Sequence, residues 1–108
     1  MQYICQLTDL VPNTGAGALF NNKQVALFRL ADGRVFAIDN YDPFSQANVL
    51  ARGIVGDLDN QIVVASPIYK QHFNLISGQC LEKPEVQLAV YAVEIKDGAI
   101  YLTEKAFA

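Results

Sequence analysis

The sequence predicts an all-β domain. Two apolar runs flank Asp32-Gly33, and two more flank Asp97-Gly98. Asp-Gly between apolar runs is typical of a β-hairpin, because glycine readily adopts the positive φ that a tight turn needs. Helix signals are confined to two short segments. With 108 residues, of which 52% are hydrophobic, we expect a single domain over residues 1–108, whose core requires neither disulfides nor metal.

The N-terminal half is expected to be mostly extended. Its predicted elements are, in chain order, a strand at residues 1–6, a capped helical turn at 8–12, a loop at 13–17, a turn at Asn21-Asn22, strands at 25–30 and 34–38, and a second helical turn at 45–50. The first strand is predicted from alternating polar and apolar side chains. Ser45 is the N-cap candidate of the second helical turn, which is too short to be stable without tertiary contacts.

The C-terminal half continues the strand pattern. Its predicted elements are a strand at residues 61–65, hairpin strands at 71–76 and 79–81 around Ser77-Gly78, and strands at 89–96 and 99–103. Because side chains alternate along a strand, Phe73 and Leu75 are expected to face the core, with His72 and Asn74 on the outer face beside Lys70. The same alternation places the following side chains on one face: Ala89, Tyr91, Val93 and Ile95.

Composition excludes several classes of function. The net charge is −3 and no basic run is present, so nucleic acid is an unfavourable partner. No segment approaches the ~20 apolar residues of a membrane span, and the N-terminal residues lack the features of a signal peptide. We therefore expect a cytoplasmic protein without membrane contact. In that compartment Cys5 and Cys80 are expected to be reduced, buried thiols rather than a redox pair.

Two segments carry the most specific pattern in the chain. The first loop, residues 40–45, reads Asn-Tyr-Asp-Pro-Phe-Ser, and the second loop, residues 66–75, reads Ser-Pro-Ile-Tyr-Lys-Gln-His-Phe-Asn-Leu. They resemble the two cluster-binding loops of Rieske proteins, which read Cys-Pro-His and Cys-Pro-x-His-Gly. At the four ligand positions this chain has Asp42, Phe44, Ser66 and Tyr69.

The ligand set of a Rieske centre is absent from this sequence. Such a centre needs two thiolates on one iron and two imidazoles on the other, whereas the whole chain has two cysteines and one histidine. The count excludes an active Rieske ferredoxin. The chain is expected to hold no metal or cofactor, and the degenerate loops are expected to lie on a Rieske-like (ISP-domain-like) β-sandwich or partial barrel.

The ligand-less pattern resembles the small subunits of assimilatory, NAD(P)H-dependent nitrite reductases. The resemblance runs from Gln2 to about Thr103, and its most specific stretches are residues 42–45, 50–57, 66–73 and 78–82. It implies a non-catalytic small subunit that supports a large subunit carrying FAD, an iron–sulfur cluster and sirohaem, which reduces nitrite to ammonium. The alternative is a stand-alone, Rieske-derived binding or adaptor module for another oxidoreductase.

The degenerate site allows two interpretations. In one, Phe44 and Tyr69 fill the space of the cluster by packing; in the other, Asp42, Tyr69 and His72 form a new polar site. Because cluster loops of Rieske-type domains meet redox partners, the resemblance also predicts a partner-binding tip. Its candidates are Tyr69 as the anchor and, around it, Lys70, Gln71, His72 and Asp42. We expect a solvated acidic rim at Asp39, Asp42, Asp57 and Asp59.

Overall fold

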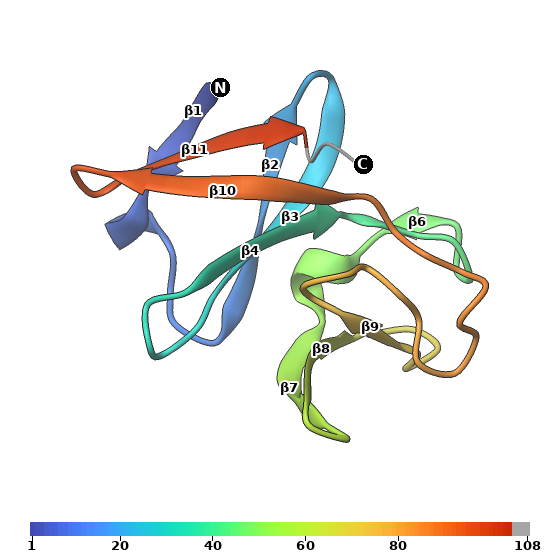
Figure 1. The fold of residues 1–108 in the computed structure, drawn as a ribbon. Coiled ribbons are helices and arrows are strands. Elements are labelled where there is room, and N and C mark those ends of the chain that lie inside the picture. Colours follow the sequence, from blue (N-terminus) through green and yellow to red (C-terminus); the bar gives the residue numbers. More distant parts are fainter. Residues whose placement is uncertain (105–108) are drawn as a thin grey trace.

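The computed structural model describes residues 1–104 and contains three antiparallel sheets (Figure 1). The largest is six-stranded, in the order β1-β11-β10-β4-β3-β2. Its strands are β1 (Gln2–Gln6), β2 (Thr14–Phe20), β3 (Lys23–Arg29), β4 (Val35–Asp39), β10 (Val90–Lys96) and β11 (Ala99–Glu104). The smaller sheets lie in the middle of the chain and comprise β5 (Tyr41–Asp42) with β6 (Ala47–Asn48), and β7 (Ile54–Leu58), β8 (Gln61–Ala65) and β9 (His72–Asn74).

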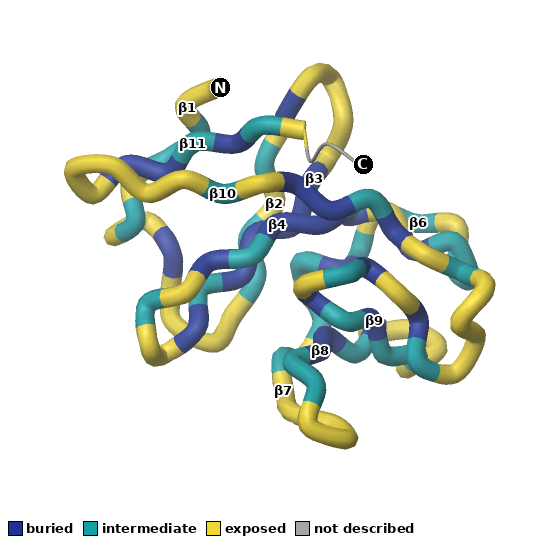
Figure 2. The backbone as a smooth tube through the Cα atoms, in the orientation of Figure 1, coloured by how far each residue is buried: buried dark blue, intermediate teal, exposed yellow. Residues whose placement is uncertain are grey.

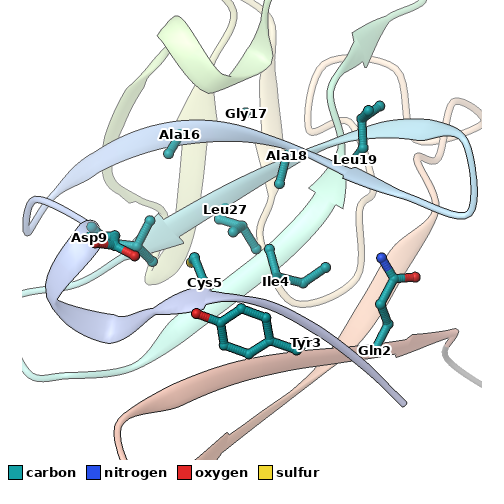
Figure 3. Close-up of a pocket in the computed structure, with 11 residues that line it drawn as sticks. Gln2, Tyr3, Ile4, Cys5, Asp9, Ala16, Gly17, Ala18, Leu19 and Leu27 are labelled. Carbon is teal, nitrogen blue, oxygen red and sulfur yellow. The ribbon is translucent and has the colours of Figure 1, made fainter.

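The six-stranded sheet curls into a partial barrel, as the sequence predicted. Its edge strands β1 and β2 both line a groove of about 470 Å³, with Tyr3 and Ile4 on one side and Ala16 and Ala18 on the other (Figure 3). The pairing register of β1 with β11 shifts between Tyr3 and Cys5, which marks a β-bulge. The barrel is nearly closed, and β1 and β2 do not pair.

The hairpins form where the turn residues predicted them. Asp97 and Gly98 have φ of 52° and 76°, which suits a two-residue turn between β10 and β11. Gly33 has a φ of 94° in the turn between β3 and β4. Asn21 and Asn22 have φ of 50° and 64° and join β2 to β3. Asparagine tolerates this left-handed region better than most residues, so the Asn21-Asn22 turn is confirmed.

The prediction of a loop at residues 13–17 is wrong from Thr14 onward. These residues begin β2, which pairs with β3 in continuous register from Thr14 to Phe20. Gly15 explains part of the difference, because a Cβ there would lie 2.3 Å from the carbonyl oxygen of Ala51. Glycine is therefore required by close packing against the short helix η2 (Leu50–Arg52), not by a turn.

Both predicted helical turns need correction. The first is the 3₁₀ helix η1 (Leu7–Asp9), which begins before Thr8 and has Gln6 as its N-cap, with the Gln6 N–H donating to Asp9 Oδ2 at 2.9 Å. The second prediction, a turn over residues 45–50 capped by Ser45, is wrong. Gln46 has a φ of 56°, which a right-handed helix does not allow, and the chain forms β6 before η2 begins.

Buried apolar side chains form two clusters. Buried residues occur both in the large sheet and in the small sheets and loops beside it (Figure 2). One cluster lies within the barrel and includes Phe20, Leu27, Tyr91, Ile100 and Leu102. The other lies between the barrel and the loops and includes Phe28, Ile38, Leu50, Val64, Phe73 and Leu75. Phe73 and Leu75 are 0% and 1% exposed, which confirms their predicted face. Tyr91 lies in the barrel cluster with Ala89 and Val93 packed against it, which confirms the common face predicted for these three residues, whereas Ile95 near the hairpin end is exposed.

Candidate functional site

The two loops lie side by side and are joined by a buried hydrogen bond. The first loop follows β4 and contains β5, and the second loop follows β8 and contains β9. Ser66 Oγ donates to Asp42 Oδ2 at 2.5 Å across 24 positions of sequence. Both side chains are buried, with exposed fractions of 0% for Asp42 and 1% for Ser66. The two residues at the cysteine positions of the Rieske pattern therefore contact each other directly.

Asp42 also shapes its own loop. Its Oδ1 accepts a hydrogen bond from the Phe44 N–H at 2.9 Å, and its carbonyl oxygen accepts one from the Gln46 N–H at 2.8 Å. This is an Asx turn closed by a backbone bond, a common conformation for Asp before Pro. It also explains why the segment after Pro43 turns back as β6 and does not enter a helix. The expectation that Asp42 belongs to a solvated rim is wrong, because the carboxylate is buried and offers no exposed surface to a partner.

The residues at the two histidine positions lie in different environments. Phe44 is half-buried and packs on the loop-side core, with its ring centroid 6.1 Å from that of Phe73. Phe44 therefore fills space between the loop and the core, as the packing interpretation predicted. Tyr69 is 60% exposed, so the expectation that its ring also fills the interior is wrong. Ile68 beside it is 47% exposed, and together they form an apolar tip on the second loop.

The turn at residues 66–71 presents this tip. The Lys70 N–H donates to the Ser66 carbonyl at 3.1 Å, and the Ser66 N–H donates to the Gln71 carbonyl at 2.9 Å. Lys70 is exposed and has a φ of 65°, which is not the extended conformation of a strand. The alternation of inward and outward side chains therefore begins only at β9 and does not include Lys70. Gln71 is half-buried, and its Oε1 is buried without a hydrogen-bond partner.

His72 is held by a residue that the sequence interpretation did not include. Glu82 accepts hydrogen bonds from the His72 N–H at 2.7 Å and from its Nδ1, also at 2.7 Å. Burial opposes ionisation of Glu82, but these bonds hold the pKa of its carboxyl below the usual value. The predicted hairpin could have revealed the pair: the Leu81 N–H donates to the His72 carbonyl, which places Glu82 beside the imidazole.

These side chains do not form the new polar site that the second interpretation proposed. Asp42 is buried beneath the loops, Tyr69 is exposed, and His72 pairs with Glu82. Among the remaining acidic residues, Asp57 and Asp59 are exposed as expected. Asp39 instead accepts a hydrogen bond from the Tyr91 hydroxyl at 2.5 Å.

The loop residues do not fit an iron–sulfur cluster. Phe44 offers no ligand atom, and hydroxyl and carboxylate oxygens are poor substitutes for thiolate and imidazole. The Ser66 hydroxyl donates its hydrogen to Asp42 Oδ2, whereas two ligands of one iron must both direct lone pairs to the metal. Within residues 1–104 there is no group of three or more His, Cys, Asp or Glu side chains arranged to hold a metal ion. In the same range, no helix is long and apolar enough to cross a membrane.

Comparisons with known proteins place this geometry in context. The family described as Rieske-like [2Fe-2S] domain matches residues 1–103. The chain is 42% identical over 102 residues to the nitrite reductase (NADH) small subunit of Salmonella typhimurium, covering 94% of each chain. It is also similar to the solution structure of the nitrite reductase [NAD(P)H] small subunit from Erwinia carotovora, with a TM-score of 0.81 and 42% identity over 99% of this chain and 82% of that one.

The chain is also similar to part of a nitrite reductase large subunit and to a dioxygenase ferredoxin subunit. The chain is 38% identical over 101 residues to the nitrite reductase [NAD(P)H] large subunit of Klebsiella oxytoca, covering 94% of this chain but 10% of that protein. It is 31% identical over 102 residues to the ferredoxin subunit of a 3-phenylpropionate/cinnamic acid dioxygenase from Photorhabdus laumondii, covering 94% of this chain and 91% of that one.

Proposed function

The chain belongs to the nitrite reductase small-subunit family of Rieske-like domains, and we propose from this membership that it is the small subunit of an NAD(P)H-dependent nitrite reductase. The observation that carries the proposal is the identity of 42% over nearly the whole length of a named small subunit. The reaction would be the six-electron reduction of nitrite to ammonium in the cytoplasm. The single domain at residues 1–108 would support a large subunit that holds FAD, an iron–sulfur cluster and sirohaem.

The relative from Klebsiella oxytoca supports assembly with a catalytic chain. There the region similar to this chain makes up 10% of a protein named as the large subunit of nitrite reductase. A domain that is covalently part of a reductase in one organism and separate in another is expected to bind that reductase in the second. We therefore infer that the partner of this chain is a nitrite reductase large subunit.

The role of the chain in the complex is structural. Electron relay needs a centre that holds the electron, and the donors at Asp42, Phe44, Ser66 and Tyr69 do not suit one. The sequence also contains no GxGxxG motif for a dinucleotide. The chain would therefore stabilise or orient the large subunit, and the chemistry would take place on cofactors of that subunit.

We propose that the tip of the second loop contacts the large subunit. Tyr69 and Ile68 present apolar surface, and Lys70 adds an exposed cation beside them. Tyrosine is favoured at interface centres because it offers a large contact area with few rotamers. Half-buried Gln71 and His72 would lie at the rim of this interface. Asp42 is buried beneath the tip and would not contact the large subunit itself.

Co-purification tests the partner and the surface together. An affinity tag on the large subunit should retain the wild-type chain, and a Tyr69→Ala/Lys70→Glu variant should be retained less. Lys96→Glu provides a matched charge reversal at an exposed site on β10. His72 is left unchanged because a glutamate there would repel Glu82 and disturb the turn. Retention of the tip variant at wild-type yield would exclude this surface, and failure to retain the wild-type chain would contradict the proposed function.

The competing function is an adaptor for another oxidoreductase. The similarity to a dioxygenase ferredoxin subunit supports this alternative, because that relative belongs to a different oxidoreductase. Ferredoxin chemistry, however, depends on a cluster that these loops do not suit. Recovery of a different oxidoreductase, and of no nitrite reductase, with the tagged small chain from nitrite-grown cells would support the adaptor.

A further inference from the structure

The carboxylate of Asp42 is unusual because it is buried without a cation. Its exposed fraction is 0%, and the ion pairs among the described residues, Arg34–Asp32 and His72–Glu82, do not involve it. Removing a carboxylate from water is costly unless hydrogen bonds replace the lost hydration. The donors that do so here therefore have more effect on the structure than ordinary surface hydrogen bonds.

Those donors come from both loops. Phe44 supplies its backbone N–H from the first loop, and Ser66 supplies its hydroxyl from the second at 2.5 Å, a short distance for an O–H···O bond. The two loops belong to different sheets, β5-β6 and β7-β8-β9. Of the side-chain hydrogen bonds in residues 1–104, the Asp42–Ser66 bond alone joins residues of the first loop to residues of the second.

Ser66 transmits this connection to the exposed tip. Its N–H and carbonyl bond to the Gln71 carbonyl and the Lys70 N–H, so both ends of the turn meet at Ser66. Its Oγ also lies 3.4 Å from the Ile68 N–H. A displacement of Ser66 would therefore move the turn that carries Ile68 and Tyr69. Lys70 has a left-handed conformation, which is unfavourable for a long side chain such as lysine, so restraint at Ser66 would help to hold this turn.

We propose that Asp42 and Ser66 form a buried latch that holds the two loops together and positions the Ile68–Tyr69 tip for the large subunit. The latch stands at the two cysteine positions of the Rieske pattern, so a hydrogen bond between side chains connects loops that a cluster would otherwise connect. Breaking the Asp42–Ser66 hydrogen bond without separating the loops would leave a poorly solvated carboxylate. The loops should therefore separate in one cooperative step. The docking part of this inference rests on the proposed function, whereas the latch itself is a property of the isolated chain.

Hydrogen exchange of backbone amides in the isolated chain tests the latch. The Lys70 and Ser66 amides are suitable probes, because their hydrogen bonds use backbone acceptors that Ser66→Ala leaves in place. We expect Ser66→Ala to accelerate their exchange about tenfold, while amides of β3 and β4 stay unchanged and show that the fold is intact. Ser77→Ala is the matched control, since Ser77 Oγ accepts a hydrogen bond only within its own turn, from the Gln79 N–H at 3.2 Å. Unchanged exchange at Lys70 and Ser66 would overturn the latch.

A double-mutant cycle separates a latch from two independent residues. Ser66→Ala leaves the buried carboxylate with one donor fewer, whereas Asp42→Ala/Ser66→Ala removes the carboxylate as well. The double variant should therefore lose less protection than the sum of the two single losses. Additive losses would overturn the coupling. If Asp42→Ala does not fold, Asp42→Asn replaces the buried carboxylate by a neutral amide of the same size, and Ser66→Ala should then cost less protection in the Asn background than in the wild type.

Affinity for the large subunit tests the positioning role. Ser66→Ala should weaken binding about fivefold or more, although Ser66 is buried, and Ser77→Ala should not. Faster exchange with unchanged affinity would overturn positioning and leave only the latch. If the wild-type chain does not bind the large subunit, the proposed function fails, and the exchange measurement still judges the latch.

Discussion

Replacing Phe73 by alanine removes the aromatic ring that connects the second loop to the core. The ring is 0% exposed, and the residue is fixed on two sides by backbone pairing, with Val64 on β8 and with Cys80. The Phe44 ring lies 6.1 Å away and would lose its main aromatic contact. Because both neighbouring segments are held by backbone hydrogen bonds, the cavity cannot collapse easily. We therefore expect a loss of about 3 to 5 kcal/mol, the range of buried Phe→Ala changes.

Urea denaturation followed by circular dichroism and tyrosine fluorescence provides the measurement, since the chain has no tryptophan. A loss of this size should lower the midpoint by more than about 1 M urea, with little change in the slope. Tyr69→Ala is the control: its ring is 60% exposed, so the change should cost less than about 0.5 kcal/mol. A loss below about 1 kcal/mol for Phe73→Ala would refute the assignment of this residue to the core.

Three further predictions concern metal, docking and pH. Purified protein should be folded and colourless, without iron or acid-labile sulfide; a stoichiometric [2Fe–2S] signal in the EPR spectrum after reduction would contradict this. The Tyr69→Ala/Lys70→Glu variant should bind the large subunit about tenfold or more weakly in calorimetry, while thermal denaturation shows unchanged stability. Affinity equal to that of the wild type would exclude the tip as the contact surface. Burial and the hydrogen bond to Asp39 raise the pKa of the Tyr91 hydroxyl, so the folded state favours the protonated phenol. Stability should therefore fall as pH rises above about 10, the usual tyrosine value, and Tyr91→Phe should lose less; equal alkaline losses would contradict the sign.

Local rules predicted the hairpins of this fold well. Asp32-Gly33, Asp97-Gly98 and Asn21-Asn22 specify their turns through the left-handed conformations that these residue types tolerate. Strand β2 was missed because its Thr-Gly-Ala-Gly start has the composition of a loop. It becomes a strand because β3 offers a partner and because the small side chain at Gly15 leaves room for Ala51. Tertiary packing here overrides local preference.

The site was predictable in position but not in chemistry. The two Pro-containing loops and the emptied ligand positions could be identified from sequence, and so could the inward face of Phe73. Contact between Asp42 and Ser66, 24 residues apart, depends on how two sheets dock and has no local signal. A lone Asp in a loop is usually solvated, which is why this one was expected on the surface. Its burial follows from the two hydrogen bonds that replace water.

The most direct measurement of the central claim is nitrite-dependent NAD(P)H oxidation by the large subunit with and without this chain. The small chain alone should show no activity. The large subunit would be purified from a strain that lacks the small chain, and adding an equimolar amount of the small chain should raise or stabilise its activity. Reintroducing the gene for the small chain should restore growth of that strain on nitrite. Full reductase activity and normal growth without the chain would contradict its assignment as a required, non-catalytic subunit.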